Sequence, residues 1–246
     1  MGQSEQTMRR PFERGIELLD RVDYQLAETE AEKDAIYRLR YRAYLREGAI
    51  APNLDHKISD RFDDLPNSWI FGVHLDGELV SSLRISVASS EHPATPSVDV
   101  FPELLKPELA KGKVVVDPTR FVADPARAAR FPELPYMTLR LAYVACQYFN
   151  ADIGLASVRA EHQAFYRRIF LRTLAPPRDY PGLIKPISLM AIDFPAERNR
   201  IFARFPHLRS SYFERRMLFE RRHVQNACVL RLPERLCEPT SIVPGA

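Results

Sequence analysis

Charged side chains stand at two positions where the sequence predicts a buried face. Arg40 lies on the apolar stripe of a helix predicted over residues 30–47, four residues from both Ile36 and Tyr44. Arg84 lies within SSLRIS, a segment with the alternating pattern of a half-buried strand. A buried ion is costly unless it is paired, so both arginines are expected to meet acidic partners.

The loop predicted over residues 48–68 carries a cluster of carboxylates, DHKISDRFDD, that includes Asp60, Asp63 and Asp64. Two interpretations stay open. In one, ion pairs between this loop and the arginines only hold the loop in place. In the other, they form a cleft where carboxylates bind a substrate amine and arginines bind its carboxylate, because arginine can hold a carboxylate through two hydrogen bonds. An amino acid would suit the second arrangement.

A further carboxylate, Asp117, precedes Pro118 in a strand predicted over residues 114–122. Proline cannot donate to a strand ladder, so the strand is expected to be bulged or broken near Pro118. A bulge can direct a carboxylate into a cleft, and a carboxylate can take a proton from an ammonium group. A salt bridge from Asp117 to Arg84 or Arg120 is the equally weighted alternative.

Two residues on a short helix predicted over residues 161–171, His162 and Tyr166, could protonate a leaving thiolate. A tyrosine on an amphipathic helix is more often part of the core, so the residue type alone does not decide between these roles.

Composition and motifs exclude several classes of protein. With 246 residues, 46% of them hydrophobic and 27% charged, the chain has the composition of a globular protein. We predict one domain over residues 21–222, an N-terminal lead-in over 1–20 and a C-terminal tail over 223–246. No apolar run is long enough for a membrane span and no secretory signal is recognised, so we expect a cytoplasmic protein with reduced cysteines at 146, 228 and 237.

The sequence lacks the glycine-rich motifs of dinucleotide-binding and P-loop enzymes, and it lacks G-x-S-x-G and H-E-x-x-H. Its six histidines show no metal-ligand spacing, so neither a metal site nor a tightly bound cofactor is expected.

Basic residues are concentrated in the C-terminal part of the chain. Residues 159–222 hold 14 basic and 6 acidic side chains, a balance of +8. The excess is either solvated helix surface or a site for an anionic partner: nucleic acid, a membrane surface or an acidic carrier protein. No nucleic-acid-binding signature accompanies it, so nucleic acid is not expected as a partner.

The predicted elements alternate in a way that indicates one mixed sheet with helices on both faces. Strands are predicted over residues 22–27, 69–75, 78–87, 114–122, 153–158 and 186–193, with an Asp76-Gly77 hairpin turn. Helices are predicted over residues 30–47, 101–109, 133–149 and 161–171, followed by two arginine-rich segments separated by Pro206.

Several strings taken together resemble the N-acyl amino acid synthase family, which is related to the acyl-homoserine-lactone autoinducer synthases and more distantly to the GNAT N-acyltransferases. They are IYRLRYRAYLREG, the DRFDD loop, DGELVSSLRIS, VVVDPTRFVAD, LPYMTLRLAYVACQYFNADIGLASVRAEHQAFYRRIF and PRDYPGLIKPISLMAID. The resemblance covers about residues 22–220. It implies an α/β, GNAT-like fold with a central mixed sheet.

The resemblance also implies a reaction, the transfer of a fatty acyl group from a thioester on acyl carrier protein to the α-amine of an amino acid or similar amine. The product carries a fatty chain, so we expect it to be membrane-active. The residues that match functional positions of these families are Arg40, Tyr44, Asp60, Asp63, Arg84, Asp117, Arg120 and Tyr166. The autoinducer synthases usually have Glu where this chain has Asp117, so a water relay could be needed.

One departure from the acetyl-CoA-dependent GNATs bears on the donor. Their glycine-rich turn, whose backbone binds the diphosphate, would fall in ADPARAARFPELP, which contains no glycine. Arg120, Arg127 and Arg130 in and before this segment could instead bind the phosphopantetheine phosphate or acidic side chains of a carrier protein, as could Arg167 and Arg168. This favours a carrier protein, with acyl-CoA remaining open as donor.

The resulting hypothesis gives each part of the site a role. Arg84 or Arg40 holds the carboxylate of the acceptor, and Asp117, or a water held by Asp60 and Asp63, takes its proton. Backbone N–H groups near Phe121 stabilise the oxyanion, and Tyr166 or His162 lies at the leaving group. The alternatives are a CoA-dependent acyltransferase, a lactone-forming autoinducer synthase, and a non-catalytic module that binds membranes or nucleic acid through its basic helices.

Overall fold

The computed structural model describes residues 17–221. Residues 1–16 and 222–246 lie outside the described part of the chain, and with them most of the predicted lead-in, the whole predicted tail, Cys228 and Cys237. Cys146 is described, and its thiol is free and buried.

Seven strands form one sheet in the order β1-β2-β3-β4-β5-β7-β6. Their bounds are β1 Val22–Leu26, β2 Ser68–Leu75, β3 Glu78–Ala88, β4 Val115–Ala123, β5 Ile153–Val158, β6 Arg172–Arg178 and β7 Ile187–Asp193. All neighbouring strands are antiparallel except β4 and β5, which are parallel. The predicted mixed sheet is therefore confirmed.

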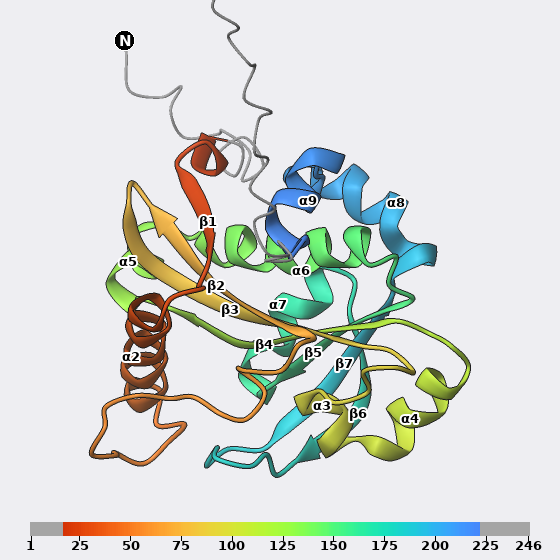
Figure 1. Cartoon of the computed structure of the whole chain (residues 1–246), viewed down its shortest axis with the longest axis horizontal. Coiled ribbons are helices and arrows are strands. Elements are labelled where there is room, and N and C mark those ends of the chain that lie inside the picture. Colours follow the sequence, from red (N-terminus) through yellow and green to blue (C-terminus); the bar gives the residue numbers. More distant parts are fainter. Residues whose placement is uncertain (1–16, 222–246) are drawn as a thin grey trace, which may run out of the picture.

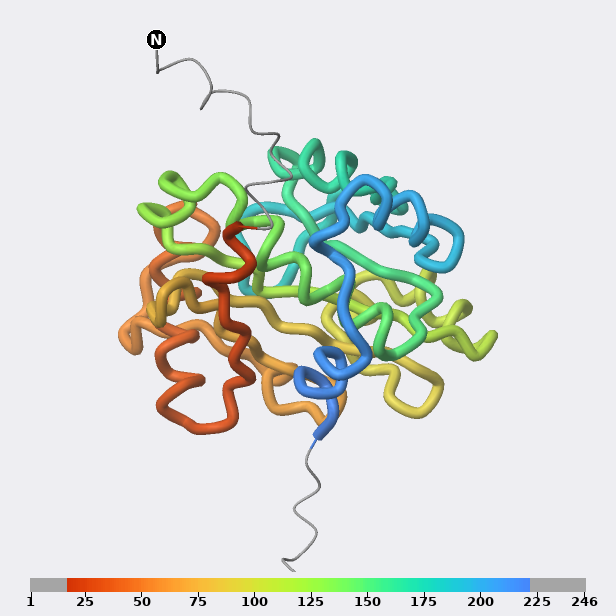
Figure 2. Tube along the Cα trace, turned by 90° about the horizontal axis from the view of Figure 1, so that it is seen from above, coloured from red at the N-terminus to blue at the C-terminus, as the bar shows by residue number. Residues whose placement is uncertain are grey.

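Helices cover both faces of this sheet, as predicted (Figure 1). The helices α6, α8 and α9 lie on one face, and α2, α3 and α4 lie on the other (Figure 1). Their bounds are α2 Glu30–Arg46, α3 Pro96–Val100, α4 Pro102–Ala110, α5 Pro125–Arg130, α6 Leu134–Tyr148, α7 Gln163–Arg168, α8 Phe194–Arg204 and α9 Tyr212–Phe219. Helix α9 packs against β1, so the first and last parts of the described chain come together (Figure 2).

Local sequence explains the elements that carry the charged residues. Helix α2 begins in a capping box, in which the Thr29 side chain accepts a hydrogen bond from the Glu32 backbone and the Glu32 side chain accepts one from Thr29. The β2–β3 hairpin turns at Asp76 and Gly77, with φ of 53° and 82°. Positive φ at both residues is what a type I′ turn requires.

The strand β4 is irregular, but its irregularity lies beyond Pro118. Pro118 pairs regularly with Ile85 of β3, and the register shifts between Ser82 and Arg84. Arg120, opposite this shift, has a φ of 55°. The bulge expected near Pro118 is therefore displaced to Arg120, where a left-handed backbone rather than a missing N–H accommodates the extra residue.

The strands β4 and β5 pair at only two positions, Val115 with Ile153 and Val116 with Gly154. Beyond Val116 the two strands are not paired, which leaves a gap in the hydrogen-bonded ladder between them. This gap positions the site described below.

Strand β6 and the short helices α3 and α5 were not predicted from the sequence. The segment RTLAPPR does not read as a strand because it contains two adjacent prolines. It forms the outermost strand of the sheet, where proline is tolerated because one side of the strand needs no donor.

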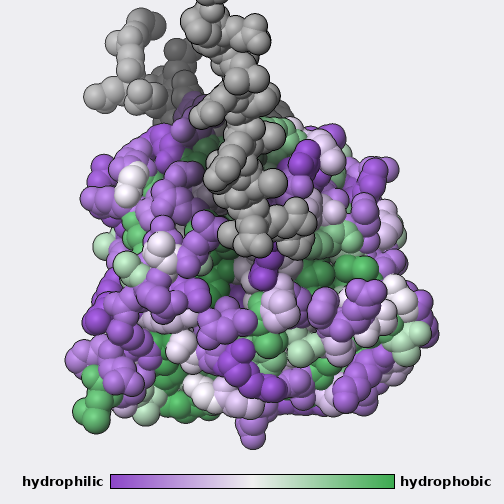
Figure 3. Space-filling model, viewed as in Figure 1, coloured by the Kyte–Doolittle hydropathy of each residue, from purple (hydrophilic) through white to green (hydrophobic). Residues whose placement is uncertain are grey.

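Among residues 17–221, no helix combines the length and the apolar character needed to cross a membrane. On the face shown in Figure 3, hydrophilic residues predominate and apolar ones occur in scattered groups between them. The main core instead lies between α6 and the sheet.

Candidate active site

A buried network of ion pairs joins α2, β3 and β4 to the acidic loop. Arg40 donates from Nη1 to both oxygens of Asp63, each at 2.9 Å. Arg84 donates from Nη1 to Asp63 Oδ1 at 3.0 Å and also to Asp60. Arg120 donates to Asp60 Oδ2 from Nη2 at 2.6 Å and from Nε at 3.1 Å. The expected pairing of arginines with this loop is thus present.

The residues of this network differ in how deeply they are buried. Arg40 and Arg84 are fully buried, whereas Asp60 and Arg120 keep some exposed surface. Burial alone would raise the pKa of Asp60, but the hydrogen bonds and charges of Arg84 and Arg120 outweigh it and hold that pKa well below its usual range. Asp60 is therefore a persistent anion and a weak base.

Asp117 belongs to a different set of contacts. Its side chain is fully buried and forms neither of the salt bridges considered for it. Ser97, in the first turn of α3, donates its backbone N–H to Oδ2 at 2.9 Å and its hydroxyl to Oδ1 at 2.7 Å. Burial raises the pKa of Asp117 despite these hydrogen bonds, so this carboxylate has a higher proton affinity than an ordinary aspartate.

A polar pocket of about 50 Å³ opens on the α2 side of the gap between β4 and β5. We call it the acceptor pocket. Its lining residues are Tyr44, Thr119, Arg120, Ser157, Tyr180 and Leu183. The Arg120 guanidinium lies 5.7 Å from the centre of the Tyr44 ring, a cation–π distance. The pocket therefore offers a cation, hydroxyl groups and aromatic surface to a small polar molecule.

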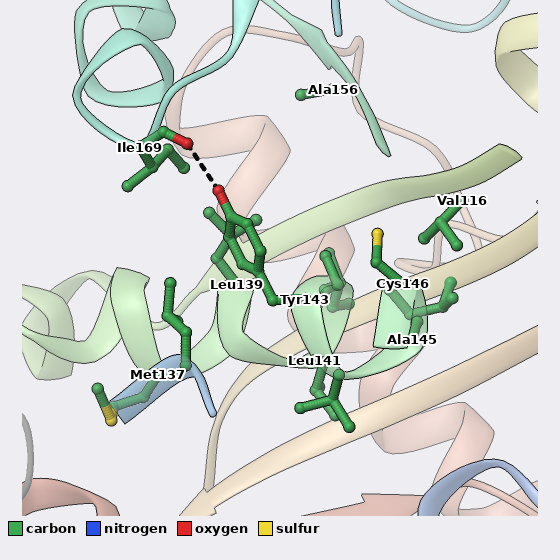
Figure 4. Close-up of a cluster of buried hydrophobic side chains, with 14 of the residues drawn as sticks. Val116, Met137, Leu139, Leu141, Tyr143, Ala145, Cys146, Ala156 and Ile169 are labelled. Carbon is green, nitrogen blue, oxygen red and sulfur yellow. Dashed lines mark hydrogen bonds between the residues drawn. The ribbon is translucent and has the colours of Figure 1, made fainter. Parts of the chain in front are cut away.

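An apolar cavity of about 20 Å³ lies on the α6 side of the same gap. We call it the acyl cavity. It is lined by Val116, Pro118, Leu139, Ala142, Tyr143, Cys146, Gly154, Leu155, Tyr166, Leu171 and Ile192. Figure 4 shows part of this wall, with Tyr143 donating its hydroxyl to the Ile169 carbonyl at 2.7 Å. The volume is close to that of a single water site, so a larger occupant must displace side chains.

Tyr166 is a buried residue of α7. It lines the acyl cavity, and its hydroxyl also interacts electrostatically with that of Tyr44, which lines the acceptor pocket. Burial, with a smaller contribution from Tyr44, raises the pKa of Tyr166 above its usual value. The phenol therefore keeps its proton at neutral pH and can act as a proton donor.

The remaining predicted residues lie outside these two spaces. His162 is exposed, with Nε2 at 2.7 Å from Arg159 Nη2. Phe121 is partly buried against the main core.

The four arginines assigned to the carrier are on the short helices α5 and α7. Arg127 pairs with Glu78, Arg130 stacks on Phe131, Arg167 donates to Gln163, and Arg168 is exposed.

The N-terminus of α5, which follows β4, is occupied by the chain itself. Asp124 caps the helix by accepting hydrogen bonds from the backbone N–H groups of Ala126 at 3.0 Å and Arg127 at 3.1 Å. A negatively charged cap at this position uses the donors that a diphosphate would need.

Three polar residues of the site, Ser97, Ser157 and Tyr180, were not predicted from the sequence. Ser157 could have been singled out from the sequence, since it is a polar residue inside the buried strand pattern IGLASV. Ser97 could not, because it lies in a proline-rich segment and reaches Asp117 only through the packing of α3 on β4. Within residues 17–221, no three His, Cys, Asp or Glu side chains are grouped to hold a metal ion.

Comparisons with known proteins agree with this geometry. A model of the family described as N-acyl amino acid synthase FeeM matches residues 35–193. The structure of FeeM, an N-acyl amino acid synthase from uncultured soil microbes, is similar with a TM-score of 0.63 at 17% identity, covering 75% of this chain and 98% of that chain. No curated protein matches the chain in sequence.

Two acyl-homoserine lactone synthases also share the fold. LasI aligns with a TM-score of 0.52 at 15% identity, covering 69% of this chain and 89% of its own. The CoA-dependent synthase BjaI aligns with a TM-score of 0.52 at 12% identity, covering 75% of this chain and 89% of its own. The expected GNAT-like fold is confirmed.

Proposed function

Because the chain belongs to the N-acyl amino acid synthase FeeM family, it is an N-acyltransferase, and we propose that it transfers a fatty acyl group from acyl carrier protein to the α-amine of an amino acid. The observation that carries this proposal is the presence of two unlike spaces on opposite sides of the gap between β4 and β5. The acyl cavity is lined by apolar side chains, and the acceptor pocket contains Arg120 and hydroxyl groups. A thioester in one would meet an amine in the other.

The apolar lining of the acyl cavity suits a fatty acyl chain, but the cavity must widen to hold one. Widening requires only that side chains of α6 and α7 move, because β4 and β5 are not hydrogen-bonded beyond Val116. We assign the oxyanion to backbone N–H groups of β4 near Phe121, because Arg120 and Phe121 have no partner in the register with β3.

Two features favour a carrier protein over CoA as the donor. The N-terminus of α5 is capped by Asp124, which opposes binding of a diphosphate there. Three arginines are exposed and available to a phosphopantetheine phosphate or an acidic carrier: Arg130 on the same helix, and Arg167 and Arg168 on α7. With this donor the enzyme would act in the cytoplasm.

The acceptor would bind with its carboxylate at Arg120. The sequence had assigned this role to Arg84 or Arg40, but both are fully buried, whereas Arg120, although paired with Asp60, keeps some exposed surface and lines the pocket. The acceptor amine attacks the thioester carbonyl once it has lost a proton, and Tyr166 protonates the departing thiolate. Much of the acceleration would come from holding both substrates in contact.

A donor comparison tests this function. Purified enzyme is given long-chain acyl carrier protein or the matching acyl-CoA, each with a mixture of amino acids, and thiol release and products are followed by thiol titration and mass spectrometry. We expect an N-acyl amino acid from the carrier donor. Product from acyl-CoA alone would refute the donor assignment, a lactone product would indicate an autoinducer synthase, and no thiol release from either donor would contradict the proposed reaction.

A further inference from the structure

Asp117 is the carboxylate best suited to accept the proton of the acceptor, yet no surface of its side chain is exposed. Both of its oxygens are held by Ser97, at 2.7 and 2.9 Å. A substrate amine in the acceptor pocket therefore cannot contact this carboxylate directly. Any proton that reaches Asp117 must arrive through a neighbouring group.

A second hydroxyl completes a path from Asp117 to the acceptor pocket. Ser157 Oγ lies 2.8 Å from Ser97 Oγ, and Ser157 lines the pocket together with Arg120 and Tyr44. Ser157 lies on β5 and Ser97 lies on α3, two elements that both contact β4. Carboxylate, hydroxyl and hydroxyl thus form a continuous line of hydrogen bonds from the protein interior to the pocket wall.

Which serine donates each hydrogen bond in this line follows from the single proton that each hydroxyl carries. A serine hydroxyl carries one proton, and Ser97 donates its proton to Asp117 Oδ1. The hydrogen bond between the serines must then be donated by Ser157. Both hydroxyls consequently point toward Asp117, and the lone pairs of Ser157 Oγ remain able to accept an N–H from the acceptor.

Other groups at the pocket are weaker proton acceptors. Arg84 and Arg120 together hold the pKa of Asp60 below its usual range in spite of burial. Tyr180 is a phenol whose pKa is raised, mainly by burial, so it is already protonated at neutral pH. Burial raises the pKa of Asp117, which makes it the better acceptor.

We propose that Ser157 and Ser97 relay a proton from the acceptor ammonium group to Asp117. This inference rests on the proposed function and adds two positioning residues to it. An N–H bond of the ammonium breaks and its proton goes to Ser157 Oγ, the Ser157 proton goes to Ser97 Oγ, and the Ser97 proton goes to Asp117 Oδ1. Ammonium and carboxylate become amine and carboxylic acid, and each serine ends with one proton.

The surroundings of Asp117 allow this step to be followed by pH. The charged and titratable groups of the described residues that interact with it electrostatically are Arg84 from β3 and Tyr180 from the segment before β7. Arginine stays charged and a buried phenol stays neutral between about pH 6 and 9. A change of rate with pH in this range therefore reports on the acceptor amine and Asp117.

The test measures kcat/KM for the amino acid acceptor from about pH 6 to 10 in the wild type and in Ser157→Ala, using the donor that the wild type accepts. We expect Ser157→Ala to lose roughly 100-fold at pH 7, within the usual contribution of general base catalysis. The loss should shrink steadily toward pH 10, because the acceptor then arrives as a free amine. Ser97→Ala should give the same pH-dependent loss, and Ser157→Thr, which keeps a hydroxyl, should restore most of the rate.

Ser188→Ala is the matched control, since Ser188 is a fully buried serine on the neighbouring strand β7 whose hydroxyl bonds Gln163 at 2.8 Å. It should follow the wild type at every pH. Equal loss at all pH values in Ser157→Ala, or no loss at all, would overturn the relay while the acyltransferase function stands. A wild type that acylates no amine from either donor would instead refute the proposed function.

Discussion

Arg40 donates to both carboxylate oxygens of Asp63, and the side chains are exposed by only 0% and 1%. The pair holds the acidic loop against α2, and Asp63 also accepts a hydrogen bond from Arg84. Breaking a buried ion pair leaves an uncompensated charge, so we expect Asp63→Asn to lower the free energy of unfolding by about 3–5 kcal/mol. Urea denaturation measures this loss.

The neighbouring Asp64 offers the control for that experiment. It pairs with Lys33 at 3.1 Å, but its side chain is 76% exposed. An exposed pair contributes at most about 1 kcal/mol, so Asp64→Asn should be nearly neutral. If the two variants lose the same stability, the loop is not anchored by the buried pair.

Arg120 should determine the preference for acceptors that carry a carboxylate. A hydrogen bond to a charged group contributes about 1.5–3 kcal/mol, so Arg120→Ala should lower kcat/KM for an amino acid by roughly 10- to 100-fold. The corresponding amine without a carboxylate should lose much less in the same variant. Because both acceptors are tested on one protein, a folding defect would lower both rates equally and leave their ratio unchanged. In a variant whose thermal unfolding matches the wild type, an unchanged ratio would place the carboxylate elsewhere.

Removing the hydroxyl of Tyr166 should slow the reaction without weakening the fold. Among the hydrogen bonds of residues 17–221, none involves this hydroxyl, so Tyr166→Phe should unfold like the wild type while kcat falls about 100-fold. Tyr24→Phe is the converse control, because Tyr24 donates to the Met137 carbonyl at 2.7 Å away from the site. It should lose about 1 kcal/mol of stability and keep its kcat. Unchanged kcat in Tyr166→Phe would remove its role as proton donor.

Gly154 should limit the length of acyl chain that the enzyme accepts. A Cβ at this position would lie 3.0 Å from Ile192 Cγ2 and 3.4 Å from Cys146 Sγ, within the wall of the acyl cavity. Gly154→Ala is therefore expected to shift the products toward shorter chains, and Cys146→Ala to shift them toward longer ones. Mass spectrometry of products from an equimolar mixture of donors measures the shift. Identical product profiles would show that the chain ends elsewhere.

His207 should make the protein sensitive to mild acid. Its ring lies in contact with Tyr136 and Phe205, and neither ring nitrogen has a partner among the described residues. Burial, assisted by the charge of Arg140, lowers its pKa to about 4. The unfolded state therefore binds a proton more readily, and stability is lost as pH falls from the unfolded pKa of about 6.5 toward 4.

The variant His207→Phe tests this origin of the acid sensitivity. It keeps an aromatic ring at the site but removes the titrating group, so its free energy of unfolding should change less than that of the wild type between pH 7 and 5. Denaturant unfolding at the two pH values provides the comparison. An equal drop in both proteins would assign the sensitivity to other groups.

Much of the fold follows from local patterns, and so does part of the site. The apolar stripe of α2 correctly placed Arg40 inward, because this period depends only on neighbouring residues. Arg84 is buried as expected, but β3 is buried on both faces from Val80 to Ala88 and is not half-buried as its alternation indicated. The acidic loop was correctly expected beside them, since buried arginines require counter-charges.

The parts that could not be predicted depend on contacts between distant segments. Ser97 meets Asp117 and Ser157 only because α3 packs on β4, 20 residues away from Asp117 and 60 from Ser157 in sequence. The left-handed backbone of Arg120 has no signal in its residue type, because glycine or asparagine usually occupies that conformation. Strand β6 was missed because its prolines are acceptable only at an edge, and the edge is defined by the whole sheet.

The short pairing of β4 with β5 divides the sheet into two leaves, β1–β4 and β5–β7, joined through backbone hydrogen bonds only near the start of the two strands, over residues 114–116 of the first leaf. Helix α6 packs on β3, β4 and β5 and therefore bridges the leaves through side chains alone. Spreading the leaves to admit a bulkier donor disturbs that packing but breaks no strand pairing. Because Arg120 of β4 and Ser157 of β5 both line the acceptor pocket, the same movement also changes that pocket. A substitution on α6 that widens the range of donors is therefore expected to alter the range of acceptors as well.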